Sequence, residues 1–389
     1  MARIEESPEN MNKANTLFSA FKNKNRMEFH PTKSSYIASK NIHPNITLGS
    51  TKLLQSDEYK YLGDILTPDG KPNAMIKARR NKITGITAEL NAILEKVKQT
   101  SALSVDAILQ YHNSIILPTL LTNSETWELN GKNLQSLETI QNITLKRLMR
   151  LPPSTPTVGI RNELNILSIE NQILKKRLMY LHRILNMKET NITKQILLQQ
   201  KYMPGNTWLT ESQTQLENLN ININLEDIET KKKNAWRKMV QDAIENKEMT
   251  ERENWLSNSS KCSRLERNRK TMSPYLQKLN PEEATTILKI RLKMLDLKTN
   301  FKTAHKDLSC PVCHSKEDTD TLEHLFACQK ISLPKNYEKI IYSNSGTDQI
   351  LAFYEKMAKA IQKLLKKRNK VLKEREEQAS TSEKKNANL

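Results

Sequence analysis

Cys310-Pro311-Val312-Cys313 is followed, after ten intervening residues, by His324-Leu325-Phe326-Ala327-Cys328. A Cys-x2-Cys turn directs two sulfurs at one point, and a His and a Cys four positions apart on a helical turn face the same side. Together the four side chains offer the nitrogen and sulfur ligands that suit tetrahedral Zn²⁺. We therefore expect a zinc knuckle within residues 301–333, with a structural Zn²⁺ held by Cys310, Cys313, His324 and Cys328.

Other histidines and cysteines could act as metal ligands in place of these four, or the four could have no metal to bind. His305 and His314 are rival ligands, but His314 directly follows Cys313 and would strain the chelate. Cys262 stands apart from the other three cysteines, and we expect it to bind no metal. The simpler alternative is a set of reduced structural thiols beside a chance histidine, and the constrained spacing favours the metal site over it.

The chain is strongly basic, with 62 Lys and Arg against 43 Asp and Glu, a net charge of +19 and a pI of about 9.6. Such an excess of positive charge makes a polyanion the expected partner, and nucleic acid is the leading candidate. No run of about 18 apolar residues and no signal peptide is present, so we expect no membrane partner. No pattern indicates a small-molecule substrate. Cysteines with metal spacing fit a reducing compartment, which points to the nucleus, the cytoplasm or both.

Hydrophobic patterning predicts a mainly α fold with a small β-containing region at the N-terminus. Strand character is confined to residues 1–67, where a helix over 10–24 precedes short candidate strands over 27–38, 46–48, 51–54 and 59–66. Eight glycines and six phenylalanines in 389 residues agree with a helix-dominated chain.

A basic amphipathic helix is predicted to begin at Pro72 and Asn73 and to carry an apolar stripe as far as Val97. Its first turns gather four cations that we expect to follow a phosphate backbone: Lys77, Arg79, Arg80 and Lys82.

Ser101 or Ser104 caps the next predicted helix, in which His112 falls on the apolar side and is interpreted as a satisfied core residue. Pro118 is expected to kink the end of that helix. Further helices are predicted over 131–150, 169–187, a short stretch from 231, 284–297 and, with a strongly basic second half, 348–377; residues 151–157 are predicted to be a stiff connector.

Several segments, in a fixed order, resemble one family. They are Glu28-Phe29-His30-Pro31-Thr32-Lys33-Ser34, Tyr59-Lys60-Tyr61-Leu62-Gly63-Asp64-Ile65, Leu121-Thr122-Asn123-Ser124-Glu125-Thr126-Trp127 and Leu151-Pro152-Pro153-Ser154-Thr155-Pro156, followed by the Cys-Cys-His-Cys knuckle. Most of residues 1–330 resembles the C-terminal part of non-LTR (LINE-type) retrotransposon reverse transcriptases, with Dong-like elements the most similar group. The resemblance implies the end of a palm with a primer-grip-like strand (1–70), a helical thumb (71–200) and the CCHC knuckle (301–333), with a helical connector (201–300) between thumb and knuckle. Beyond the knuckle, the residues themselves predict a basic helix (334–378) and a disordered tail (379–389).

The resemblance also implies roles for particular residues. Lys33 would lie near the phosphates of the incoming nucleotide, and Tyr61, Leu62 and Gly63 would hold the primer end through a tight backbone turn. The implied partners are RNA and DNA, as template-primer or as target site. From the residues alone, Lys33 could instead be a solvated loop lysine, and Tyr61 and Leu62 could be strand core.

The family's polymerase centre holds two Mg²⁺ ions with one aspartate and an Asp-Asp pair on a hairpin, and the resemblance implies that this chain begins just after the position of that pair. Asp57, Asp64 and Asp69 lack the strand-flanked, paired context that two Mg²⁺ ions require. We therefore assign no catalytic residue, expect Mg²⁺ only in a full-length polymerase, and expect the chain to be inactive as an RNA-directed DNA polymerase. No carboxylate cluster of a restriction-like endonuclease follows the knuckle. The alternative function is a stand-alone zinc-knuckle protein that binds nucleic acid or acts as an adaptor.

Overall fold

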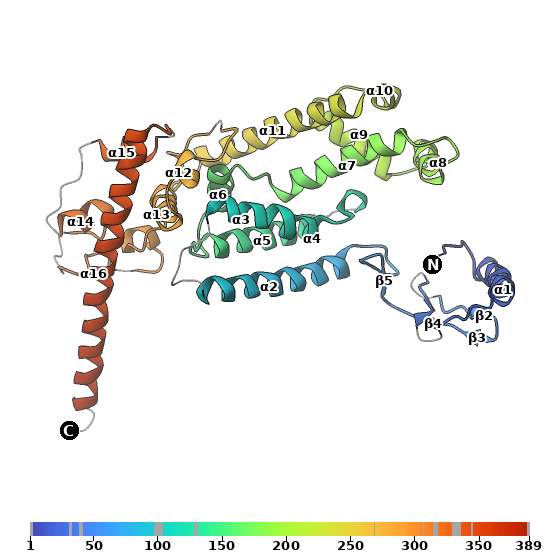
Figure 1. The fold of residues 1–389 in the computed structure, drawn as a ribbon, viewed down its shortest axis with the longest axis horizontal. Helices are drawn as coiled ribbons and strands as arrows, with labels where there is room; N and C mark the ends of the chain where they lie inside the picture. The colour runs from blue at the N-terminus through green and yellow to red at the C-terminus, as the bar shows by residue number, and fades with distance from the viewer. Residues whose placement is uncertain are drawn as a thin grey trace.

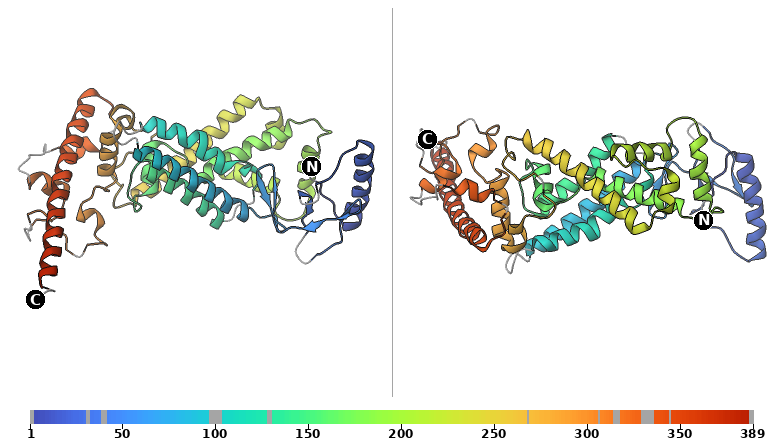
Figure 2. Two further views of the ribbon diagram at one scale, coloured as in Figure 1. Left: turned by 60° about the horizontal axis from the view of Figure 1, so that its bottom comes forward. Right: turned by 90° about the horizontal axis from the view of Figure 1, so that it is seen from above.

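The computed structural model describes residues 3–30, 33–38, 42–96, 104–127, 131–267, 269–305, 307–313, 318–328, 336–343 and 345–386. The protein is mainly helical, and its strands lie near the N-terminus, as predicted. The molecule is elongated: the β-containing unit lies at one end, layered helices fill the middle, and the long helix α16 crosses the other end (Figures 1 and 2).

The N-terminal unit contains helix α1 (Pro8–Lys24) and two very small sheets, and α1 packs against β2 of one of them. Strands β1 (Ser35–Tyr36) and β4 (Leu54–Gln55) pair in parallel, and β2 (Thr47–Leu48) and β3 (Thr51–Lys52) pair antiparallel. Helix and sheet are joined by amide side chains, because Asn12 Oδ1 accepts from the Thr47 amide at 3.0 Å and Asn15 Nδ2 donates to the Thr47 carbonyl at 2.8 Å.

Residues 59–66, predicted as one strand, form a hairpin of β5 (Tyr59–Tyr61) and β6 (Asp64–Leu66). The two residues of its turn, Leu62 and Gly63, have φ angles of 48° and 89°. Positive φ at both central residues is what a tight hairpin turn requires, and glycine adopts it without strain. Leu62 is 81% exposed, so the interpretation of this residue as strand core is wrong.

The first helical layer begins with α2 (Asn73–Lys96), which lies against α5 (Gly131–Leu148). Ser104 is the cap of α3 (Val105–Tyr111), since its hydroxyl accepts from the Ala107 amide. A π-helical turn, His112–Ile116, then leads into α4 (Leu117–Leu121), with Pro118 in its first turn. Proline has no N–H to continue the regular α-helical bonding, which fits the altered turn before it.

His112 is fully buried, as predicted, but it is only partly satisfied. Its Nδ1 lies 3.1 Å from Asn113 Oδ1, whereas its buried Nε2 has no hydrogen-bond partner in the described part of the chain. Burial lowers the pKa of this imidazole, so His112 stays neutral in the core.

Helix α6 (Thr157–Leu164) begins where the predicted connector, 151–157, ends, in a stretch for which the sequence predicted no element. Beyond it, α7 (Ile169–Leu185) and α11 (Lys233–Ser257) lie side by side and form a second core with α8 (Ile192–Gln199), α9 (Trp208–Asn218) and α10 (Leu225–Thr230). Trp236 is buried there and donates to the Leu178 carbonyl at 3.0 Å, which confirms that it is a core residue. Helix α11 is long, not the short helix expected.

The C-terminal core contains α12 (Pro274–Lys278), α13 (Pro281–Arg291), α14 (Leu322–Ala327), α15 (Tyr337–Ile341) and α16 (Asp348–Asn386). Buried side chains of α3, α5, α6 and α11 belong to the same core. Three short 3-10 turns, Ser124–Thr126, Gln200–Tyr202 and Lys298–Phe301, complete the helical elements described. Helix α13 ends six residues before the predicted boundary at 297. Helix α16 continues through 379–386, where a disordered tail was expected, and the rest of that predicted tail, 387–389, lies outside the described residues. None of the helices described is both long enough and apolar enough to cross a lipid bilayer.

A bidentate ion pair between Glu163 of α6 and Arg291 of α13 lies at the centre of this core. Arg291 Nη2 is 3.0 Å from Glu163 Oε1 and Arg291 Nε is 3.1 Å from Oε2, and both side chains are fully buried. Ser273 Oγ and Tyr275 OH also donate to Glu163, at 2.6 and 2.8 Å. Burial alone would raise the pKa of Glu163, but the nearby positive charge of Arg291 holds it below its usual range.

Arg291 extends this network toward the segment that precedes α16. Its Nη1 donates to the carbonyls of Ile341 and Ser343 at 2.5 and 3.1 Å. Tyr354 of α16 donates to the same two carbonyls at 3.0 and 2.7 Å. One charged pair therefore fixes helices that are more than a hundred residues apart in sequence.

Replacing Glu163 with glutamine is expected to lower the free energy of unfolding by about 3–5 kcal/mol, because Arg291 would keep its charge in a dry site without a counter-charge. The measurement is urea unfolding followed by circular dichroism. The control is Glu338→Gln, which removes a carboxylate from the half-exposed Arg264–Glu338 pair and should cost less than about 1 kcal/mol. Equal losses in the two variants would contradict the central role of the buried pair.

Candidate metal centre

The four residues predicted as zinc ligands come together. Cys310, Cys313, His324 and Cys328 each place one ligand atom within 4.8 Å of the others. Cys313 Sγ lies 3.3 Å from His324 Nε2. In a tetrahedral zinc site with ordinary bond lengths, neighbouring ligand atoms are about 3.5–3.8 Å apart. The cluster can therefore hold a metal ion such as Zn²⁺ with small adjustments of side chains.

Local backbone pairing explains why the cluster forms. Ser309 and Thr319 form an antiparallel bridge, and the Cys310 amide donates to the Asp318 carbonyl at 2.9 Å. Thr321 then caps α14 by accepting from the His324 amide at 3.1 Å. The ligands consequently come from a closed loop and from the short helix that follows it.

Helix α14 presents two different faces. Its Leu325 and Phe326 are buried in the C-terminal core, while His324 and Cys328 are partly exposed and belong to the cluster. Burial of the apolar face therefore fixes the rotation of the helix that carries two of the ligands.

The surroundings of the cluster favour ligation. Asp318 Oδ1 lies 3.5 Å from His324 Nδ1, in the position of the carboxylate that commonly orients a metal-binding histidine. Burial, together with the neighbouring thiols of Cys310 and Cys313, raises the pKa of Cys328 to about 12. Three thiols this close cannot all ionise beside one another, and a divalent cation is the charge that would allow it.

The competing residues lie elsewhere. His305 is exposed and does not belong to the cluster, and His314 lies outside the described residues. Cys262 is fully buried in the C-terminal core, and burial raises the pKa of its thiol to about 11. A Cβ added at Gly159 would lie 3.0 Å from Cys262 Sγ, so this cysteine packs against the backbone of α6.

Asp320 anchors the knuckle to the rest of the protein. It is 1% exposed, and Arg368 of α16 donates to its Oδ2 at 2.8 Å. The same carboxylate oxygen accepts from the Lys298 amide at 2.8 Å, and the Asp320 carbonyl accepts from Thr299 Oγ1 at 2.6 Å. Sequence patterning counted Arg368 only as part of a basic surface, although its spacing from the apolar Ile361 and Leu364 places it on the buried stripe.

Most of the residues predicted to contact nucleic acid are exposed, but they do not lie beside the metal cluster. Lys33, Leu62 and Gly63 are exposed, and Tyr61 is half-buried beside the hairpin turn. On α2, the exposed members of the basic group are Lys77, Arg80 and Lys82. The knuckle and the N-terminal unit lie at opposite ends of the molecule, so the structure does not combine them into one site (Figure 1).

Arg79 was expected to contact nucleic acid, and this prediction is wrong, because Arg79 is 6% exposed and belongs to the core. Its guanidinium binds Asp64 Oδ1 at 2.8 Å and the carbonyls of Leu120 and Thr122 at 3.0 and 2.5 Å, and it lies 4.6 Å from the ring centre of Trp127. Four positions after Met75, it falls on the buried face of α2, so it cannot reach a phosphate backbone.

No family model matches the chain, and a comparison with curated proteins found no match. What the protein does must therefore be inferred from its own residues.

The purified protein is expected to contain about one zinc per chain, and Cys310→Ser is expected to lose it, because a tetrahedral site needs all four ligands. Elemental analysis by mass spectrometry after gel filtration measures this. The matched control is Cys262→Ala, which removes a cysteine from the core and should leave the zinc content unchanged. A folded protein without zinc, or equal zinc in the two variants, would refute the assignment.

Chelation should loosen α16 as well as the knuckle, because Asp320 can hold Arg368 only while the loop around it is ordered. Hydrogen exchange with and without a chelator tests this coupling. We expect faster exchange in residues 318–328 and around Arg368, with α7 and α11 unchanged. If the chelator leaves the exchange rates of α16 unchanged, α16 and the metal site are not coupled.

Proposed function

We propose that this chain is the C-terminal, nucleic-acid-binding part of a non-LTR retrotransposon reverse transcriptase, with a structural Zn²⁺ in its Cys-Cys-His-Cys knuckle. The observation that carries the proposal is the Cys3His cluster, which is anchored to a helical body of strongly positive charge. A metal cluster of this size buries little surface, so the ion would supply folding energy and not chemistry.

The contacts of Arg79 support the resemblance on which the family assignment depends. Two of the segments that carry it, 59–65 and 121–127, are far apart in sequence, and both contact this side chain. Asp64, next to the hairpin turn, accepts from Arg79 and from Asn123 Nδ2 at 2.7 Å. The Tyr-Leu-Gly turn is thus fixed at the start of the basic helix α2, as a primer-grip hairpin beside a thumb would be.

In this proposal the exposed side of α2 contacts the template-primer backbone through Lys77, Arg80 and Lys82. Leu62 and Gly63 would face the primer end, and Lys33 would contact phosphate. Polymerisation would need the two Mg²⁺ ions and the aspartates of a full-length enzyme, which this sequence does not contain. The chain alone would bind RNA and DNA without extending a primer.

One observation favours the alternative of a stand-alone zinc-knuckle adaptor. The knuckle packs with α13 and α16 in the C-terminal core, at the end of the molecule opposite the N-terminal unit. A module of this kind could work without a polymerase beside it. The two functions differ in whether the α2 surface binds nucleic acid.

The chain should bind an RNA/DNA hybrid with an affinity that falls steeply as salt rises, and it should incorporate no nucleotide with Mg²⁺ or Mn²⁺. Replacing Lys77, Arg80 and Lys82 with glutamine should weaken binding and reduce the salt slope by about 2–3, since each duplex phosphate contact contributes about 0.9. Fluorescence anisotropy and primer extension are the measurements.

The matched control replaces three exposed lysines on other elements, Lys188, Lys232 and Lys238, with glutamine and so removes cations in the same number. If both triple variants lose the same affinity for the hybrid, the loss reflects net charge and not the α2 surface. That result would favour the adaptor. Primer extension by the chain alone would contradict the predicted absence of a catalytic centre.

A further inference from the structure

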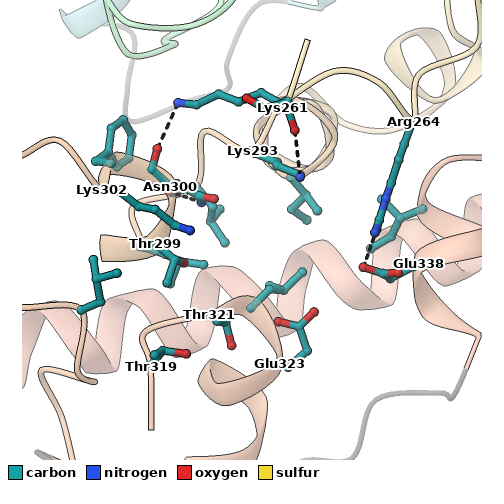
Figure 3. Close-up of a pocket in the computed structure, with 18 of the residues that line it drawn as sticks. Lys261, Arg264, Lys293, Thr299, Asn300, Lys302, Thr319, Thr321, Glu323 and Glu338 are labelled. Carbon is teal, nitrogen blue, oxygen red and sulfur yellow. Dashed lines mark hydrogen bonds and ion pairs between the residues drawn. The ribbon is translucent and has the colours of Figure 1, made fainter. Parts of the chain in front are cut away.

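A cleft of about 770 Å³ separates the knuckle from the helical body. Thr319, Thr321 and Glu323 line it from the knuckle, Lys261 and Lys293 line it from the helical body, and Lys302 lines it from the end of the 3-10 turn Lys298–Phe301 (Figure 3). Its volume falls within the range of about 300–1,000 Å³ that is usual for pockets that bind small ligands. The cleft therefore has room for more than a single small anion.

The three lysines give this cleft an uncompensated positive charge. Lys261 Nζ donates to the Asn300 carbonyl at 3.0 Å, and Lys293 Nζ donates to the Ser260 carbonyl at 3.2 Å. In the part of the chain that the structure describes, none of the three lies within ion-pair distance of a carboxylate. Burial lowers the pKa of Lys261, and the nearby charge of Lys293 lowers it further.

The carboxylates of the cleft lie apart from the three lysines. Glu338 pairs with Arg264 at 2.5 Å. Glu323 accepts a hydrogen bond from Tyr337, a neutral donor that leaves the carboxylate charged. The three lysines outnumber this single carboxylate, so the cleft keeps an excess of positive charge for an incoming anion.

The backbone holds one of these lysines in an unusual conformation. Lys293 follows the end of α13 and has a φ of 51°, in the left-handed region where glycine is the usual residue. Lys293 adopts this φ although it is not a glycine, and it directly follows the fully buried Leu292. The side chain is therefore presented to the cleft by a fixed turn and not by a flexible loop.

An aromatic ring lies beside the charges. Phe301 lines the same cleft, is half-buried, and has Lys261 Nζ at 5.5 Å from its ring centre. Aromatic rings next to cations are the arrangement with which proteins bind unpaired bases and their phosphates. A duplex keeps its bases stacked inside and could not use this ring.

We infer that this cleft binds a single-stranded segment of nucleic acid, with its phosphodiester groups on Lys261, Lys293 and Lys302 and a base against Phe301. The inference rests on the proposed function, and it assigns a second contact surface, far from α2, that distinguishes unpaired from paired strands. The knuckle forms one wall of the cleft through Thr319 and Thr321, so an intact metal cluster would be needed to keep it open.

The test uses the full zinc-loaded chain and a fluorescein-labelled, unstructured DNA oligonucleotide. Replacing Lys261, Lys293 and Lys302 with glutamine should weaken binding by about 10- to 100-fold in low salt and reduce the salt slope by about 2, at about 0.7 for each single-strand phosphate. Replacing Lys188, Lys232 and Lys238 with glutamine is the control, and it should leave the affinity within about threefold of the parent chain.

A second variant separates stacking from charge. Phe301→Leu keeps an apolar side chain but removes the ring, so it should weaken single-strand binding by about fivefold or more with an unchanged salt slope. Neither variant should weaken binding to a blunt-ended duplex as much as it weakens binding to the single strand.

The outcomes distinguish the two proposals. If the parent chain binds no nucleic acid, the proposed function fails and this inference fails with it. If the chain binds but the cleft triple variant behaves like its control, or loses duplex and single-strand affinity equally, the inference fails while the proposed function stands.

Discussion

The buried pair between Glu163 and Arg291 is the interaction on which the C-terminal half of the protein depends. A dry ion pair is stable only when its remaining donors and acceptors are occupied, and here a serine, a tyrosine and two backbone carbonyls occupy them. The pair brings α6, α12 and α13 together with the segment that leads into α16. Since the knuckle packs on α13 and is tied to α16, its position follows from this pair as well.

The knuckle is held from two sides. Leu325 and Phe326 of α14 pack into the core, and Asp320 is fixed by Arg368. Between these anchors lie the four ligands, and a metal ion bound to them would add order to the loop that carries Cys310 and Cys313. The same anchors place one wall of the lysine-lined cleft, which joins the metal centre to the surface proposed to bind unpaired strands. At the other end of the molecule, Arg79 plays a comparable organising part around the hairpin turn.

Local signals in the sequence predicted much of this structure. The start of α2 after Pro72, the Ser104 cap, the beginning of α16 at Asp348 and the grouping of the four ligands all depend on neighbouring residues, and the structure has them. Helix α6 was missed because its buried face includes Asn162 and Glu163, whose partners lie over a hundred residues away. Arg79 and Arg368 were taken for surface cations for the same reason, since only the fold reveals Asp64 and Asp320 beside them. The lysine-lined cleft likewise combines segments that no spacing rule connects.

The most direct test of the account is the coordination of zinc in the purified chain, measured by X-ray absorption at the zinc edge. Three sulfurs at about 2.3 Å and one nitrogen at about 2.0 Å are predicted, because Cys310, Cys313, His324 and Cys328 supply that donor set. Loss of one sulfur from this shell in Cys328→Ser would support the assignment further. A shell of oxygen and nitrogen alone, or a folded chain that takes up no zinc, would contradict the account of the knuckle and of the cleft that it borders.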